Sequence, residues 1–135
     1  MRVLVFRINA DHYAVPMDSV HQVLRHPQVT AVPLSPANLL GVLNVRGEIV
    51  PLFDTGVLTG SGVLADPPFA VLVSGTKDLM ALAALELPMA AEFDQPVAPG
   101  ARPGELGVYS QGGRLVVLVD IEALVSNQME LPRAS

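Results

Sequence analysis

The sequence contains no cysteine and no tryptophan, and aromatic residues make up only 4% of its 135 positions. The absence of cysteine excludes disulfides and thiolate metal sites, and it is typical of proteins from a reducing compartment. The sequence also lacks the run of about 18 apolar residues that a spanning helix needs. Its longest apolar stretch, residues 79–93, is interrupted by Glu86 and Pro88. No basic-then-apolar signal stands at the amino terminus. We therefore expect a soluble, cytoplasmic protein.

Charge is also scarce, because only 16% of the residues are charged and the net charge is −5. The few lysines and arginines do not cluster. A nucleic-acid-binding protein needs a basic patch to neutralise phosphates, and a protein that binds anionic lipid needs one too. The composition therefore predicts no nucleic-acid partner and no direct membrane insertion.

Aliphatic side chains are abundant, since hydrophobic residues make up 50% of the chain. At this length the chain forms one domain or two very small ones. A small domain does not hide that much apolar side chain completely, so some remains at the surface. Two explanations stay open: an apolar surface for a partner, or simply an aliphatic-rich core.

The chain contains an internal repeat. Residues 40–54 align without a gap on residues 106–120, an offset of 66 positions. Identical pairs include two glycine pairs and one aspartate pair, which chance matching of apolar residues does not readily supply. The identical pairs are Leu40/Leu106, Gly41/Gly107, Val42/Val108, Gly47/Gly113, Val50/Val116, Leu52/Leu118 and Asp54/Asp120, and Leu58/Leu124 extends the match.

Each copy of this repeat predicts a hairpin followed by a short helix. A glycine-bearing turn joins two apolar strands, and the second strand ends at Asp54 or Asp120. An aspartate there accepts backbone N–H groups as the N-cap of the next helix. We expect these helices at Thr55–Leu58 and Ile121–Val125, and we favour capping over catalysis for both aspartates.

A weaker correspondence extends upstream. Strand–turn–strand patterns occupy residues 3–15 and 71–82, the second with a bend at 76–78, and further strands are expected at Val20–Leu24 and Leu85–Met89. Residues 94–104, rich in proline and glycine, predict a surface loop. The fold class is therefore mainly β: one domain of two small barrels, the first at approximately 9–66, the second at approximately 67–126 plus the N-terminal strand, then a tail at 127–135.

No pattern in the sequence points to catalysis. There is no nucleophile–base–orienter set and no phosphate-binding loop. His12, His21 and His26 lie within one early stretch but lack the spacing of a metal site, and the acidic residues are scattered. We predict no cofactor, no metal and no enzymatic activity.

The repeat breaks at the hairpin turn, where the first copy has Arg46-Gly47 and the second has Gly112-Gly113. Because the second copy manages without arginine, the hairpin itself does not require Arg46. The residue is either a functional group or a turn residue that is solvated or bonded to a neighbouring loop. Arginine is favoured at interfaces because its planar guanidinium makes several directed hydrogen bonds.

The segment Asn44-Val45-Arg46-Gly47-Glu48-Ile49-Val50-Pro51-Leu52-Phe53-Asp54 resembles the signature of CheW-like domains, Asn-x-Arg-Gly-x-Ile-x-Pro-x-x-Asp. Upstream residues from Phe6 to Val42 follow the order and approximate spacing of that family. The resemblance implies two SH3-like barrels packed side by side. It also implies an adaptor in two-component chemotaxis signalling that couples chemoreceptors to the regulatory domain of a CheA-type histidine kinase.

The resemblance further implies partner-binding residues. Arg46, with Asn44 and Val45 beside it, matches the signature, and the family's arginine is associated with receptor coupling. Val20 and Val23 match apolar positions of a groove between the barrels, which would take the receptor's helical signalling tip. Gln22 stands where many members carry a glutamate, so a charge-assisted bond to a receptor cation is lost there. The protein would then be recruited to membrane-associated receptor arrays.

Three alternatives remain open. A divergent adaptor of a pilus, gliding or developmental chemosensory system would bind a kinase without a standard receptor. A small-ligand-binding β-barrel would hold a closed polar pocket near His12, His21 or Asp54, whereas an adaptor needs a shallow apolar groove. A purely structural barrel would self-associate without affinity for a kinase.

Overall fold

The computed structural model describes residues 1–75 and 78–130 of the chain. Part of the predicted bend at 76–78 and the end of the predicted tail lie outside these residues. The described part is mainly β, with a single 3-10 turn at Met17–Ser19 and two α-helices. The strands are β1 (Arg2–Ile8), β2 (Asp11–Pro16), β3 (Val20–Arg25), β4 (Leu39–Val45), β5 (Glu48–Phe53), β6 (Phe69–Ser74), β7 (Leu79–Ala84), β8 (Met89–Glu92), β9 (Glu105–Gln111) and β10 (Arg114–Val119), and the helices are α1 (Thr55–Thr59) and α2 (Ile121–Glu130).

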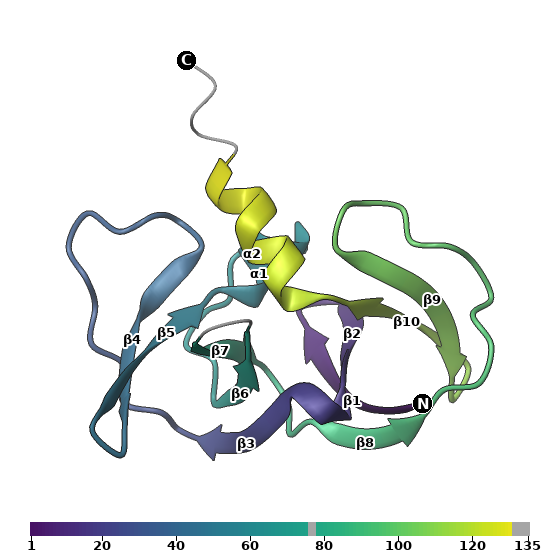
Figure 1. Cartoon of the computed structure of the whole chain (residues 1–135), viewed down its shortest axis with the longest axis horizontal. Coiled ribbons are helices and arrows are strands. Elements are labelled where there is room, and N and C mark those ends of the chain that lie inside the picture. Colours follow the sequence, from purple (N-terminus) through teal and green to yellow (C-terminus); the bar gives the residue numbers. More distant parts are fainter. Residues whose placement is uncertain (76–77, 131–135) are drawn as a thin grey trace.

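The strands form two five-stranded sheets that lie side by side, with α2 rising over their junction (Figure 1). We call them sheet A, in the order β8-β1-β2-β10-β9, and sheet B, in the order β3-β6-β7-β5-β4. The two orders match strand for strand when β1–β5 are equated with β6–β10. Each sheet contains one parallel pair, β2 with β10 and β5 with β7. The internal repeat of the sequence is therefore a repeat of topology.

The two repeats exchange their first hairpins. Sheet B takes β3, β4 and β5 from the first repeat but the hairpin β6–β7 from the second, and sheet A takes β1–β2 from the first repeat with β8–β10 from the second. The predicted division at about residue 66 was wrong in this respect. It placed β2 with the first unit and β6–β7 with the second, because neighbouring segments were assumed to share a sheet.

The predicted closure of each barrel is not confirmed. Both sheets are strongly curved in Figure 1. Within residues 1–75 and 78–130, however, the strand pairings run in open order and leave β8 and β9, and β3 and β4, as outer strands. Bridges from loops partly cover two of them, Thr30 to Val42 on β4 and Ala98 to Val108 on β9.

One large core joins the two sheets. It contains Leu4, Phe6 and Ile8 from one face of β1 together with the buried residues of sheet B, such as Leu52 and Leu82. A second, smaller core fills the inside of sheet A, with Val3, Ala14, Phe93, Tyr109, Val116 and Leu118. Because alternate residues of a strand face opposite sides, β1 contributes to both cores. The sheets therefore fold as one unit.

Both aspartate caps are confirmed. Asp54 is buried, its Oδ1 accepts the N–H of Val57 at 3.2 Å, and its Oδ2 accepts the N–H of Leu64 at 3.2 Å. Asp120 Oδ1 accepts the N–H of Ala123 at 3.3 Å. The helices begin where predicted, but α2 continues past Val125 to Glu130. No helix in the part of the chain described is long and apolar enough to cross a membrane.

The strand predicted at Leu85–Met89 was placed too early, because β8 begins only at Met89. Pro88 precedes it and has no N–H to donate to a sheet. Leu85 instead donates its N–H to the carbonyl of Arg7 at 3.2 Å, which holds the connecting loop against the end of β1. The loop 94–104 lies outside the regular strands, as expected, and is mostly exposed.

A polar clamp fastens the β1–β2 turn of sheet A to the loop after α1. Asn9 Nδ2 donates to the carbonyl oxygens of Ser61 at 3.1 Å and Gly62 at 2.8 Å. The Ser61 hydroxyl donates to Asp11 Oδ2 at 2.9 Å and lies 2.9 Å from the Tyr13 hydroxyl. These bonds connect residues about 50 positions apart in the chain, so they hold the exchanged hairpin in place.

We predict that Asn9→Ala lowers the free energy of unfolding by about 2 kcal/mol, because two hydrogen bonds are lost at a residue with φ of 53°. Asn9→Gly is the matched control, since it loses the same bonds but tolerates that backbone conformation. It should cost about 1 kcal/mol less, measured by urea denaturation of both variants. Equal losses in both variants would show that the backbone conformation carries no part of the effect.

Candidate functional site

The β4–β5 turn holds Arg46 in a backbone conformation that side chains disfavour. Arg46 and Gly47 have φ angles of 52° and 86°, and Gly112 and Gly113 in the β9–β10 turn have 58° and 81°. Positive φ at both central residues is the geometry of a two-residue hairpin turn that matches the twist of the strands. The two turns therefore have the same shape, and in the second copy glycine occupies both positions that require positive φ.

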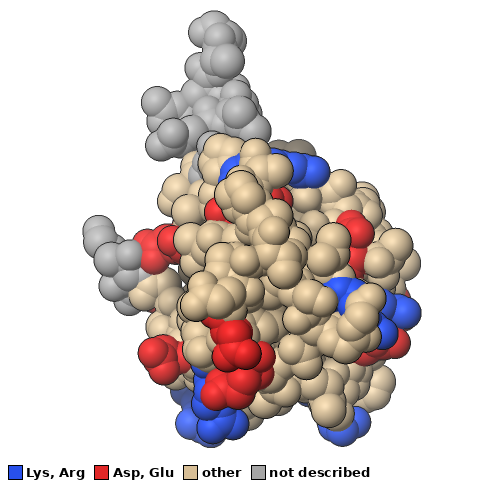
Figure 2. Space-filling view, turned by 90° about the vertical axis from the view of Figure 1, so that its right-hand side faces the viewer, with Lys and Arg blue, Asp and Glu red and all other residues tan. Residues whose placement is uncertain are grey.

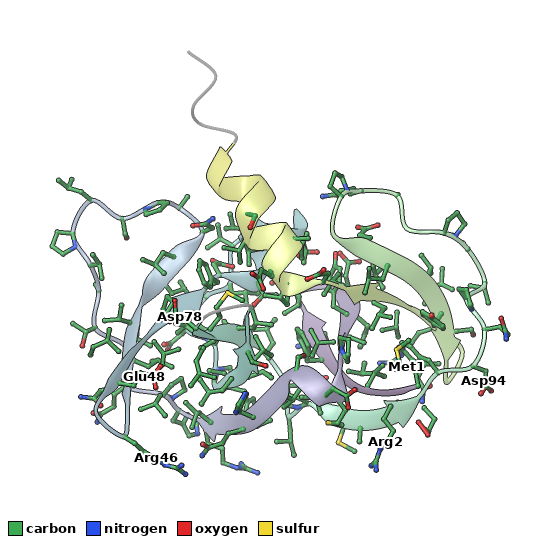
Figure 3. The ribbon with its side chains drawn as sticks, in the orientation of Figure 1. Met1, Arg2, Arg46, Glu48, Asp78 and Asp94 are labelled. Atoms are coloured by element: carbon green, nitrogen blue, oxygen red, sulfur yellow. The ribbon has the colours of Figure 1, made fainter. Side chains whose placement is uncertain are left out.

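A non-glycine residue in this conformation costs about 1 kcal/mol. No hydrogen bond or ion pair of the Arg46 side chain offsets this conformational cost, because the side chain is exposed and makes neither with any described residue. Figure 3 shows it at the tip of the hairpin, directed away from the body of the molecule. The interpretation of Arg46 as bonded to a neighbouring loop is thereby excluded for the described residues, and a solvated or functional group remains.

The two neighbours of Arg46 in the signature contribute to the structure. Asn44 Oδ1 accepts the N–H of Gly47 at 2.9 Å, which fixes the turn. Val45 is partly buried and packs against the large core. Of the three signature residues predicted to contact a partner, Arg46 alone makes no hydrogen bond or core contact with the residues that the structure describes.

The other three predicted residues lie on β3. This strand is an outer strand of sheet B, paired with β6 on one side only. Val20 and Val23 are partly buried and pack against the large core, whereas Gln22 is exposed. The pairing register shifts between Val20 and Gln22, so a bulge lies at this point of the strand. Bulges often re-aim a side chain next to a functional site.

The structure places the two predicted groups on the two outer strands of one sheet rather than in one contiguous cluster. The segment between them, residues 26–38, is fastened to β4 by two backbone hydrogen bonds between Thr30 and Val42, of 3.0 and 2.9 Å. This segment exposes Val29, Val32 and Leu34, and Leu34 is fully exposed with φ of 61°. Sequence reasoning did not single these residues out, although the large apolar fraction indicated that such side chains exist.

A shallow apolar hollow lies where the two sheets meet at the start of α2. Its volume is about 200 Å³, and sheet A contributes Val15 and Val119, sheet B contributes Val73, and α2 contributes Ile121. Ser19, directly before β3, also lines it. The two residues predicted to line a groove between the halves, Val20 and Val23, are not among the residues that line this hollow.

In the part of the chain that the structure describes, histidine and carboxylate side chains do not gather into a metal-binding group. No group of three or more histidine, aspartate or glutamate residues there is placed to hold a metal ion. His21 and His26 are exposed. On the face shown in Figure 2, basic and acidic side chains lie in small separate groups among uncharged residues, so this face has no continuous basic patch.

His12 has a defined environment. Its Nε2 lies 2.7 Å from Arg114 Nη1, so the neutral ring accepts a hydrogen bond from the guanidinium. Burial, followed by the positive charge of Arg114, lowers the pKa of His12 below its ordinary value. The ring is therefore held in its neutral form near pH 7.

Comparison with known proteins identifies relatives along the whole chain. The model of the CheW-like domain family matches residues 2–129. The chemotaxis protein CheW of Klebsiella aerogenes is 31% identical over 93% of this chain and 81% of its own length. The chemotaxis protein CheW of Thermotoga maritima is 25% identical over 91% of this chain and 86% of its own length.

The fold is also similar to that of a CheW protein of known structure. The crystal structure of the scaffolding protein TtCheW from Thermoanaerobacter tengcongensis is similar to it with a TM-score of 0.81 and 18% identity, over 91% of this chain and 86% of that chain. The mainly β architecture of two units side by side is thereby confirmed, as is the resemblance carried by the signature from Asn44 to Asp54. The chain belongs to the CheW-like domain family.

Proposed function

We propose that this protein is an adaptor of a chemosensory pathway that couples a receptor to a CheA-type histidine kinase. Family membership and the relatives named as chemotaxis proteins support this proposal. The observation that carries it is Arg46. The chain keeps an arginine at a position of positive φ, exposed and without a partner in the described structure, where its own second copy has glycine.

In this proposal, different surfaces of the protein bind the receptor and the kinase. An apolar hollow at the junction of the sheets suits the packing of a receptor's helical tip, because helices bind by laying an apolar face into a groove. Arg46 in the β4–β5 turn and Gln22 on β3 are two of the exposed polar residues at the outer strands of sheet B, and polar groups at the rim of an interface fix its orientation. The outer strands themselves are available to the related regulatory domain of the kinase.

The adaptor would act in the cytoplasm at membrane-associated receptor arrays. Its mechanism would be binding and geometry, without a chemical step of its own. The test is a calorimetric titration of the protein with the regulatory domain of a CheA-type kinase from the same organism, repeated with a fragment of a receptor's signalling tip. Binding of both supports the coupling role, and binding of neither would overturn it.

Binding of the kinase alone would favour the specialised adaptor of a pilus, gliding or developmental system. Gln22 favours this specialised adaptor as a second candidate function, because it lacks the charge of the glutamate that many family members carry.

We predict that Arg46→Gly weakens receptor-tip binding at least about tenfold, because a directed cationic contact is lost. The same change should leave the free energy of unfolding within about 1 kcal/mol of the wild-type value, since Gly112 occupies the equivalent turn without an arginine. Calorimetric titration and urea denaturation measure the two quantities.

Arg46→Lys serves as the control that keeps the positive charge but not the planar fork, and it should retain part of the affinity. Unchanged binding by Arg46→Gly, in a protein that remains folded, would remove Arg46 from the receptor contact.

A second change tests β3. Gln22→Glu should tighten binding to a receptor tip that carries a lysine or arginine opposite this position by about three- to tenfold, because an ion pair replaces a hydrogen bond between a cation and a neutral amide. The gain should shrink as the salt concentration rises. Gln22→Met is the matched neutral variant. If Gln22→Glu and Gln22→Met bind alike at low salt, β3 does not face a receptor cation.

A further inference from the structure

The inside of sheet A opens into a cavity at one end. Its volume is about 260 Å³, and its walls come from β1, β2, β8, β10, the end of β9 and the loops that precede β8 and β10. The small core closes the other end of the same interior, with residues such as Val3 and Val116. The cavity is separate from the hollow beside α2 and from the outer strands of sheet B.

Strand alternation shows which side chains face this cavity. Val3, Val5 and Arg7 lie on one face of β1, and Arg114, Val116 and Leu118 lie on one face of β10. His12 is the direct cross-strand partner of Arg7. The parallel register sets Val116 level with His12, and Arg114, two residues before it on β10, reaches the His12 ring with its side chain at 2.7 Å. Arg7, His12 and Arg114 together form a polar layer that lines the cavity.

The internal repeat provides a control for this layer. Parallel pairing of Leu118 with Ala14 in sheet A corresponds to that of Leu52 with Ala81 in sheet B. By this register the equivalents of Arg7, His12 and Arg114 are Ser74, Leu79 and Glu48. The same architecture thus forms with a neutral, an apolar and an acidic residue in that layer. The fold does not require cations there.

The cations of this layer are incompletely satisfied. Arg7 Nη1 lies 3.4 Å from Glu86 Oε2, a partly exposed pair. Arg7 Nε is buried and has no hydrogen-bond partner among the described residues. Arg114 donates to the neutral ring of His12 rather than to a carboxylate. Of the two guanidinium groups, only that of Arg7 is paired with a carboxylate among the described residues, and Arg114 is exposed where it lines the cavity.

We propose that this cavity binds a small organic carboxylate with a short apolar chain. Paired guanidinium groups match the planar geometry of a carboxylate and form charge-assisted hydrogen bonds to it. The volume is below the 300–1,000 Å³ or so of sites for drug-sized ligands, so it suits a short chain. Leu87 and Met89, both substantially exposed, line the cavity and offer apolar surface to that chain.

The test is a ¹H–¹⁵N nuclear magnetic resonance titration of the whole protein with hexanoate at pH 7. Saturable shifts are expected at the amides of β1, β8 and the β9–β10 turn. Hexanamide, which keeps the chain without the charge, and inorganic phosphate, which keeps a charge without the chain, are the comparison ligands. Both should bind at least about tenfold more weakly than hexanoate.

The variant Arg7→Gln/Arg114→Gln should weaken hexanoate binding at least about tenfold, whereas Arg2→Gln, an exposed change elsewhere on β1, should not. Retention of the thermal transition shows that the double variant is folded. A bound carboxylate should also raise the pKa of His12, which faces Arg7, Arg114, Glu86 and Asp11, and the histidine ring resonances report this directly.

The proposal is overturned if hexanoate gives no saturable shifts, if hexanamide or phosphate binds as tightly, or if the folded double variant binds as well as the wild type. The titration contains no kinase and no receptor, so its outcome is independent of the adaptor role. A positive result would place a ligand site near His12, where the small-ligand alternative located one, on a chain that still serves as an adaptor.

Discussion

Two short parallel pairings hold this molecule together. β2 pairs with β10 and β5 pairs with β7, and each pair joins a strand of one sequence repeat to a strand of the other. The residues at these contacts, including Ala14, Leu118, Leu52 and Ala81, are almost completely buried. Without these pairings each sheet would divide into a three-stranded and a two-stranded fragment, and an isolated two-stranded fragment is at best marginally stable in water. The exchange of hairpins therefore makes one folding unit of two repeats.

The same exchange creates the outer strands on or beside which the proposed partner-binding residues lie. It carries β3 and β8 away from the hairpins that precede them and leaves each as an outer strand of the opposite sheet. It also brings β1 between two cores, so that one face of β1 seals the junction and the other lines the interior of sheet A. The outer strands and the cavity are thus consequences of one topological feature, while the side chains upon them differ between the repeats.

Much of this could be predicted from the sequence because it depends on local patterns. The repeat, the turn at Arg46-Gly47, the caps Asp54 and Asp120 and the family signature all consist of residues close together in the chain. The assignment of strands to sheets could not be predicted in this way, because an apolar segment pairs equally well with several partners until tertiary packing selects one. β8 was misplaced because its start depends on Pro88 and on a bond from Leu85 to Arg7.

The site was predicted unevenly for the same reason. The comparison of Arg46 with Gly112 needed only the repeat, and the structure added the backbone cost that makes the arginine informative. The layer of Arg7, His12 and Arg114 was missed, because His12 and Arg114 are 102 positions apart and meet only through the parallel pairing. The composition predicted that some apolar side chains would be exposed, but it does not indicate where they lie, so the exposed residues of the loop 26–38 were not identified from it.

Coupling itself is the central claim, and reconstitution measures it most directly. A CheA-type kinase and a receptor of the same organism would be combined in membranes, and the rate of kinase autophosphorylation followed with and without this protein, before and after a receptor ligand is added. We predict that receptor ligand changes the kinase rate only when the protein is present. An unchanged kinase rate, at protein concentrations sufficient to saturate both partners, would overturn the coupling role.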